Sequence, residues 1–347
     1  MQDNLYFTIT ENVDNLSEEA LNLQLKEKPE LTQILSKKQL KTSLEDTKYH
    51  LNYLSEAIAF DDKKIFINYA KWVKHLFETR NIPLIWFIDS LKAIETTLNK
   101  RIENNLVSEY LDAALESIQE TDSITTFIDT TTEIGLYARK YTDFLLDTNK
   151  DAASKLIEEM TDKGFTVEDI YLNIFAVSQY EVGLLWHNNE ISVALEHYCT
   201  AATQMIMSQL YPIIFSTEKE DKKALITCTK NELHELGARM VADFLELNGW
   251  QTYYIGAQSH YESTIDSIKS YQPDVVAIST TISYHLSEVE ELIKLIRSNE
   301  DFNNIKIIVG GRPFNENKDL YKKLDADGYA PDAKKAVQVC EEIIKNG

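Results

Sequence analysis

Short apolar runs alternate strictly with amphipathic segments from Ala224 to the end of the chain. Strand patterns occur at 224–229, 251–255, 275–279, 306–309 and near 328–329, and helical spacing of apolar residues fills the intervals. This alternation favours parallel strands joined by crossover helices. We therefore predict a doubly wound parallel sheet over residues 222–347. In such sheets ligands bind beyond the carboxyl ends of the strands.

The rest of the chain has helical patterns. Segments at 133–146, 149–162, 167–186 and 190–211, with short connections, predict a four-helix bundle over 131–216. A charged run at 217–223 follows as a linker. Residues 1–125 predict an all-helical domain of unknown role, in which the aromatic residues Trp72, Trp86 and Phe87 belong to the core; the alternative is that they line a ligand pocket. None of the ten glycines precedes Gly135, which agrees with long helices and few tight turns there.

Charge and cysteine usage exclude several classes of protein. With 35 Lys and Arg against 56 Asp and Glu, the net charge is −21, which argues against direct DNA binding. The three cysteines are too widely spaced for a metal motif or a disulfide framework. We see no signal peptide and no membrane-length apolar run, so we expect a reduced, cytoplasmic protein without membrane attachment.

The loop after the first predicted strand carries Glu232, His234 and Gly237. A histidine between strand and helix can present one ring nitrogen to a metal, while the nearby carboxylate accepts a hydrogen bond from the other nitrogen. The glycine leaves room for a bulky group at the start of the helix. The alternative is a solvated loop histidine with no ligand.

Small residues mark the ends of the other predicted strands, which is what a long ligand tail lying along the sheet edge requires. They are Gly256, Ser279, Thr281, Gly310, Gly311 and Gly328. Loops between strands and helices favour glycine and serine in any case, and this alternative explains each position singly.

Glu232-x-His234-x-x-Gly237, Ser279-x-Thr281 and Gly310-Gly311 resemble the cobalamin-binding, Rossmann-like domain of methionine synthases, mutases and corrinoid methyl carriers. The family usually has Asp where this chain has Glu232, a departure shared by its light-sensing branch. The resemblance covers roughly 222–347. It implies that His234 is the lower cobalt ligand and that the glycines and hydroxyl residues line a slot for the nucleotide tail.

In the bundle, Trp186 is separated by nine residues from Glu196-His197, a spacing similar to that of CarH-type photoreceptors, which bind adenosylcobalamin. The resemblance implies that Trp186 packs beside the adenosyl group and that Val193, Glu196 and His197 line its pocket. It also implies that His187 takes the upper cobalt site after light breaks the Co–C bond. Otherwise Trp186 is bundle core, Glu196-His197 a polar helix face and His187 a surface histidine.

The resemblance implies a light sensor and regulator that is not an enzyme and has no catalytic residues. Photolysis of adenosylcobalamin would change its conformation or oligomeric state, and we expect a homo-oligomer. Residues 1–125 lack the MerR-type DNA-binding domain of the photoreceptors, so we expect a protein partner, engaged by the N-terminal helices. The alternatives are a corrinoid methyl carrier of a methyltransferase system and a cobalamin storage or trafficking protein.

Overall fold

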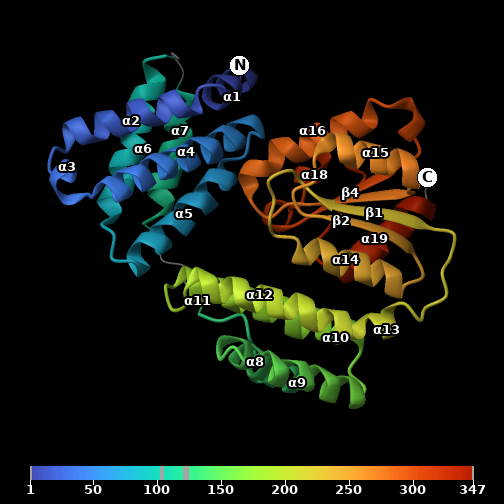
Figure 1. Ribbon diagram of the computed structural model, residues 1–347. Coiled ribbons are helices and arrows are strands. Elements are labelled where there is room, and N and C mark those ends of the chain that lie inside the picture. Colours follow the sequence, from blue (N-terminus) through green and yellow to red (C-terminus); the bar gives the residue numbers. More distant parts are fainter. Residues whose placement is uncertain (1, 102–104, 120–124, 346–347) are drawn as a thin grey trace. The chain divides into compact units, whose positions relative to one another are not determined.

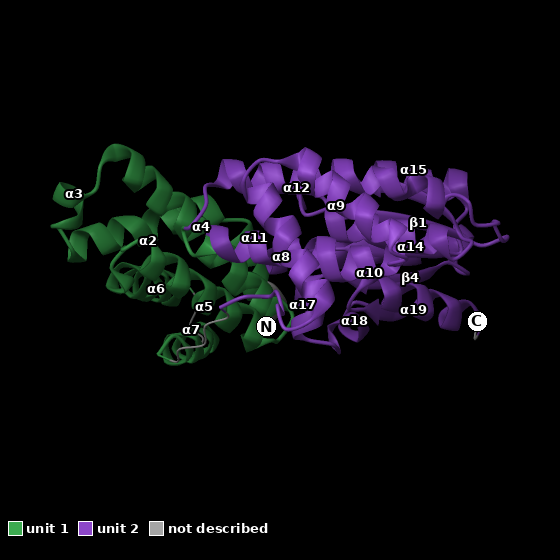
Figure 2. Cartoon of the chain, turned by 90° about the horizontal axis from the view of Figure 1, so that it is seen from below, with its two compact units in different colours: residues 1–123, 187–189 green, residues 124–186, 190–347 purple. Residues whose placement is uncertain are grey.

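The computed structural model describes residues 2–101, 105–119 and 125–345, and the chain divides into two compact units. Unit 1 contains residues 1–123 together with 187–189, and unit 2 contains 124–186 and 190–347 (Figure 2). Residues 102–104 and 120–124 of the predicted N-terminal domain lie outside the described residues. The domain limits predicted from the sequence stay predictions.

Unit 1 is built from helices around an apolar core that includes Leu54, Phe66 and Phe87. Of the three predicted core aromatics, Phe87 is buried, whereas Trp72 and Trp86 are half-buried. The helices are α1 (Gln2–Thr10), α2 (Val13–Glu27), α3 (Leu31–Ile34), α4 (Lys37–Ala59), α5 (Lys63–Thr79), α6 (Leu84–Asn99) and α7 (Leu106–Ser117).

The first part of unit 2 is the predicted helix bundle. Polar residues cap its helices: Thr132 accepts from the Gly135 N–H, and Ser192 accepts from the Leu195 N–H. The predicted helix 167–186 is present but contains a π-helical segment, η1 (Tyr171–Ala176). The other elements are α8 (Glu133–Leu146), α9 (Lys150–Asp162), α10 (Val167–Ile170), α11 (Val177–His187), α12 (Val193–Met207), η2 (Ser208–Leu210) and α13 (Tyr211–Ile214).

The second part of unit 2 is a five-stranded parallel sheet in the order β2-β1-β3-β4-β5, which confirms the predicted fold class. Every predicted strand is present: β1 (Lys223–Cys228), β2 (Gln251–Gly256), β3 (Val275–Ser279), β4 (Lys306–Gly310) and β5 (Gly328–Ala330). Helices α14 (Leu236–Leu247) and α19 (Ala333–Lys345) cover one face, and α15 (Tyr261–Tyr271) and α16 (Leu286–Arg297) cover the other (Figure 1). Short helical segments complete it: η3 (Ser283–His285), η4 (Glu300–Phe302), α17 (Arg312–Glu316) and α18 (Leu320–Lys323).

Bundle and sheet share one apolar core within unit 2. It runs from Tyr141 and Phe175 in the bundle to Phe244 and Trp250 beside the sheet, and all four side chains are buried. This packing fixes the bundle against α14, the helix that follows the loop containing His234. Within the described part of the chain, every helix is too short or too polar to span a bilayer.

Candidate functional site

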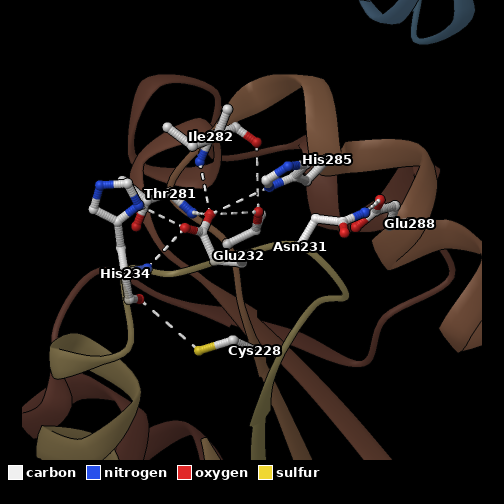
Figure 3. Close-up of polar contacts among 9 residues, drawn as sticks. Cys228, Asn231, Glu232, His234, Thr281, Ile282, His285 and Glu288 are labelled. Atoms are coloured by element: carbon white, nitrogen blue, oxygen red, sulfur yellow. Dashed lines mark hydrogen bonds and ion pairs between the residues drawn. The ribbon is translucent and has the colours of Figure 1, made fainter. Parts of the chain in front are cut away.

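Glu232 and His234 form a hydrogen-bonded pair in the loop that follows β1 (Figure 3). His234 Nδ1 lies 2.6 Å from Glu232 Oε1, and the His234 backbone N–H donates to the same oxygen at 2.9 Å. The Glu232 side chain is fully buried, while 58% of the His234 side chain is exposed. A carboxylate oxygen accepts, so Nδ1 carries the proton and the other ring nitrogen, Nε2, is the basic one of the neutral ring.

The second oxygen of Glu232 is held by the segment after β3. Oε2 accepts from the backbone N–H groups of Thr281 at 2.7 Å and Ile282 at 3.0 Å, and from the Thr280 hydroxyl at 3.3 Å. The predicted residue Thr281 therefore contributes its backbone here, and its unpredicted neighbour Thr280 contributes the side chain. Loops from two adjacent strands thus fix the carboxylate that holds His234.

These contacts shift both pKa values. Burial alone would raise the pKa of Glu232, but the His234 side chain, the nearby His285 side chain and the His234 backbone N–H together outweigh it and hold the pKa well below its ordinary range. The hydrogen bond to Glu232 raises the pKa of His234 against the opposing effect of burial, and the charges of Glu232 and Glu196 add to the rise. The carboxylate is therefore ionised throughout the neutral range.

A second polar group lies behind Glu232 and was not predicted from the sequence. His285 is 3% exposed, and its Nδ1 lies 3.5 Å from Glu232 Oε2, a contact longer than a good hydrogen bond. Asn231 donates to Glu288 Oε1 at 2.8 Å, and burial raises the pKa of Glu288. His285 and Glu288 come from η3 and α16, so only the folded chain brings them to the loop.

The predicted small residues have different surroundings. Ser279 and Gly310 are half-buried and end adjacent strands, where they pair in register. A Cβ added at Gly237 would meet nothing within 4 Å, so the start of α14 is open. Gly328 begins β5 beside Ile308 and therefore lies away from the carboxyl edge of the sheet. A Cβ added at Gly328 would collide with the Val339 side chain.

Gly256 and Gly311 have conformations that explain their identity without a ligand. Gly256 has φ +87° and Gly311 has φ +106°, a region that favours glycine. A Cβ on Gly256 would lie 3.0 Å from Glu235 Oε2. The tail-binding role predicted for both glycines stays a prediction.

In the bundle, the charge of Glu196 contributes to the raised pKa of His234. Glu196 also contacts His197 Nδ1, and His197 is mostly exposed. Val193 is 52% exposed, and Trp186 is half-buried in the last turn of α11. The adenosyl-pocket roles predicted for these residues are not tested by these positions.

His187 belongs to unit 1. Its ring stacks on Trp72 with centroids 4.9 Å apart, and its Nε2 donates to the Trp72 carbonyl at 3.0 Å. The Thr79 hydroxyl and the Arg80 guanidinium donate to the His187 carbonyl at 3.0 and 3.1 Å. One of the two ring nitrogens that could bind a metal is therefore engaged by a backbone carbonyl.

His234 offers one exposed imidazole nitrogen as a metal ligand. Among the described residues there is no group of three or more His, Cys, Asp or Glu side chains that could hold a metal ion. A single exposed imidazole retains a metal only when the metal brings its other ligands with it, as in a macrocyclic complex. The buried Cys228 does not assist, because burial raises the pKa of its thiol to about 12.

Comparison with protein families agrees with this site. Residues 222–338 and residues 137–211 each match a family model described as a B12 binding domain. The two models correspond to the sheet and to the bundle. The chain therefore carries B12-binding domains in which a helix-bundle cap is joined to a Rossmann-like fold.

Individual relatives are corrinoid proteins. Dimethylamine corrinoid protein 1 of Methanosarcina acetivorans is 23% identical over 56% of this chain and 91% of its own length. Trimethylamine corrinoid protein 1 of the same organism is 24% identical over 59% of this chain and 95% of its own length. The solved structure of the Methanosarcina barkeri monomethylamine corrinoid protein, 20% identical, matches with a TM-score of 0.55 over 60% of this chain and 98% of its own, which shows a shared fold.

These relatives correct the functional prediction. The prediction of an adenosylcobalamin light sensor is wrong, because the two Methanosarcina acetivorans relatives are corrinoid proteins named for methylamines rather than photoreceptors. The resemblance holds at the level of a cap and a Rossmann-like domain that bind B12, and the adenosyl form is not specified. The upper-ligand role of His187 was inferred from the same resemblance, and it stays a prediction.

Proposed function

We propose that this chain is a corrinoid methyl carrier that exchanges a methyl group with methyltransferase partners and is not itself the methyltransferase. The observation that carries the proposal is the Glu232–His234 pair, which presents an exposed imidazole at the carboxyl edge of the sheet. Sequence similarity supports the proposal, because the chain aligns with 91% of the length of a dimethylamine corrinoid protein.

The residues around His234 fit a corrinoid. The open space at Gly237 leaves room for a bulky group at the start of α14. The Thr229 hydroxyl, in the same loop as Glu232, is fully buried and has no hydrogen-bond partner among the described residues. A polar group of a bound ligand would satisfy it.

Each residue would have a defined task. His234 would bind cobalt through Nε2, and Glu232 would fix the ring orientation and make Nε2 a stronger ligand. Thr281 and Ile282 would keep the carboxylate in place through their backbone N–H groups. Ser279, Thr281 and Gly310, with Gly237, would contact the nucleotide tail. The bound corrinoid would supply a cobalt atom that accepts and releases a methyl group.

Binding is tested with the full chain and methylcobalamin. His234→Ala should raise the dissociation constant at least about tenfold, and Glu232→Gln should raise it about 10- to 100-fold, as for other groups that orient metal ligands. His260→Ala is the matched control, because His260 is an exposed histidine of the same sheet domain. Equal affinity of the wild type and His234→Ala would contradict the assignment of the ligand.

Methyl transfer needs a separate measurement. The full chain is loaded in the dark with methylcobalamin labelled in the methyl group and mixed with host extract and a thiol acceptor. The label should move to the thiol faster than from free methylcobalamin under the same conditions. Label that stays on the protein, or leaves no faster than from the free compound, would contradict a carrier role.

A further inference from the structure

The carboxylate of Glu235, next to His234 in the chain, joins three other segments of unit 2. Gln204 Nε2 from α12 donates to Oε1 at 3.0 Å. Oε2 accepts from the Tyr254 hydroxyl of β2 at 3.2 Å and from the Ala257 backbone N–H at 3.1 Å. Both oxygens are used, so bundle, sheet edge and ligand loop meet at one side chain.

The backbone of the neighbouring strand is shaped around this carboxylate. Gly256 has φ +87°, and a Cβ there would lie 3.0 Å from Glu235 Oε2. The strand register also shifts at this position. Ile226 pairs with Tyr254, but the following residue, Thr227, pairs with Gly256 and skips Ile255. Glycine at 256 is thus explained by the close approach of Glu235.

The bundle presents one helix face to the same loop. Glu196, Thr200 and Gln204 recur every four residues and therefore share a face of α12. Thr200 donates weakly to Glu196 Oε1 and more closely, at 2.8 Å, to Gln179 of α11. Gln204 is the member of this face that hydrogen-bonds to the loop segment beside His234.

A second contact between bundle and α14 lies away from the ligand loop. The Tyr171 hydroxyl in η1 donates to Asp243 Oδ2 at 2.8 Å, and both residues are buried. Asp243 is two helical turns beyond Glu235 along α14. The buried pair can act as a fixed anchor, whereas the half-buried Gln204–Glu235 contact is the one adjacent to the site.

We infer that Glu235 is a positioning residue that couples the bundle to the lower-ligand loop. A corrinoid bound at His234 orders this loop, and the Gln204–Glu235 hydrogen bond passes that ordering to α12. The inference rests on the proposed corrinoid site. It concerns how occupancy of the site reaches the bundle.

Hydrogen exchange of the full chain, with and without methylcobalamin, tests the inference. In the wild type, the cofactor should slow amide exchange in residues 193–207 by about tenfold, the size expected for one hydrogen bond to a charged group. In Gln204→Ala, methylcobalamin should still bind, but the slowing in 193–207 should disappear. Exchange in α9 serves as the internal reference.

Two further variants separate coupling from general stability. Tyr171→Phe removes the other hydrogen bond between bundle and α14 and should keep the response of 193–207. The double variant Gln204→Glu with Glu235→Gln reverses the amide and the carboxylate and should restore the response at least partly. Each result would support a specific contact.

The outcomes distinguish two kinds of failure. A wild type that does not bind methylcobalamin would overturn the proposed function and this inference together. Binding without any change in 193–207, or a response in Gln204→Ala as large as in the wild type, would overturn the inference alone.

Discussion

The backbone carbonyl of Thr280 occupies the space that a side chain on Gly311 would need. A Cβ at Gly311 would lie 1.9 Å from the Thr280 oxygen, and Gly311 has φ +106°. Thr280 in turn donates its N–H to the Gly310 carbonyl at 3.1 Å and its hydroxyl to Glu232. The end of β4 therefore sets the position of the segment that holds Glu232.

Gly311→Ala should lower the free energy of unfolding by roughly 2–4 kcal/mol, because it adds backbone strain to a direct collision. It should also weaken methylcobalamin binding, since Thr280 and Thr281 must move. Urea denaturation and an absorbance titration measure the two effects. A variant as stable as the wild type would show that the loop relaxes freely.

Gly237→Ala is the matched comparison and should act in the opposite direction on stability. Gly237 lies in the first turn of α14 with an ordinary φ and open space around its Cα. Alanine there should raise the free energy of unfolding by up to about 1 kcal/mol. If the open space receives the cofactor, affinity for methylcobalamin should fall at the same time. An unchanged dissociation constant would remove Gly237 from the proposed site.

Glu232→Gln should lower the free energy of unfolding of the unloaded chain by roughly 2–4 kcal/mol at pH 6, because a buried, fully hydrogen-bonded carboxylate is replaced by a neutral amide. The sign of the pH dependence follows from the pKa shifts. The depressed pKa of Glu232 gives stability above the ordinary value of 4.5, and this stability is lost as the pH falls further. The raised pKa of His234 gives stability below 6.5 that is lost as the pH rises through the folded value.

The difference in the free energy of unfolding between the wild type and Glu232→Gln should therefore be greatest between about pH 4.5 and 6.5. Chemical denaturation at a series of pH values measures it, and Glu262→Gln, an exposed carboxylate on α15, is the control. A difference that keeps growing below pH 4 would mean that the pKa of Glu232 is not depressed.

Asp243→Asn should stabilise the chain at alkaline pH. Burial, partly offset by the Tyr171 hydrogen bond and by Arg239, raises the pKa of Asp243 to about 6 from 3.8. The folded state therefore holds this proton more tightly than the unfolded state, and stability falls as the pH rises from 3.8 to about 6. Asparagine still accepts from Tyr171, so the gain at pH 8 should be roughly 2–3 kcal/mol and should vanish below pH 4. A lower free energy of unfolding of the variant at pH 8 would show that the attraction between Arg239 and the Asp243 carboxylate outweighs the cost of burying that charge.

His187→Phe should affect unit 1 and leave the corrinoid site unchanged. Phenylalanine keeps the stack on Trp72 but removes the Nε2 donor to the Trp72 carbonyl, at a cost of about 1 kcal/mol in the free energy of unfolding. The dissociation constant for methylcobalamin and the absorbance spectrum of the loaded chain should match those of the wild type. A changed spectrum would return His187 to the cobalt site.

The sheet could be predicted from the sequence because each strand is a short apolar run bounded by polar or small residues. The predicted and observed limits differ by about one residue at β1, β2 and β4. The contact between Glu232 and His234 could also be predicted, since two residues of spacing in one loop brings a carboxylate to an imidazole. Local patterns were sufficient for both.

The remainder of the site depends on residues that are distant in sequence. Gln204 and Glu235 are separated by 31 positions, and His285 reaches Glu232 only through the β1–β3 pairing. The π-helical segment at Tyr171 has no sequence signal of its own. The functional error has a related cause: a helix bundle before a B12-binding sheet is shared by carriers and photoreceptors, and the spacing of Trp186 and Glu196 did not separate them.

The three residues His187–Asn189 group with unit 1, although the sequence on both sides belongs to unit 2. His75 Nε2 lies 2.7 Å from Asn188 Oδ1, in addition to the contacts of His187. Unit 1 therefore supplies polar partners to the turn between α11 and α12. A gene fragment beginning at residue 124 would encode the B12-binding segments but would leave the turn between α11 and α12 without its polar partners. Any evolutionary exchange of the N-terminal helices for another module would have to rebuild this turn as well.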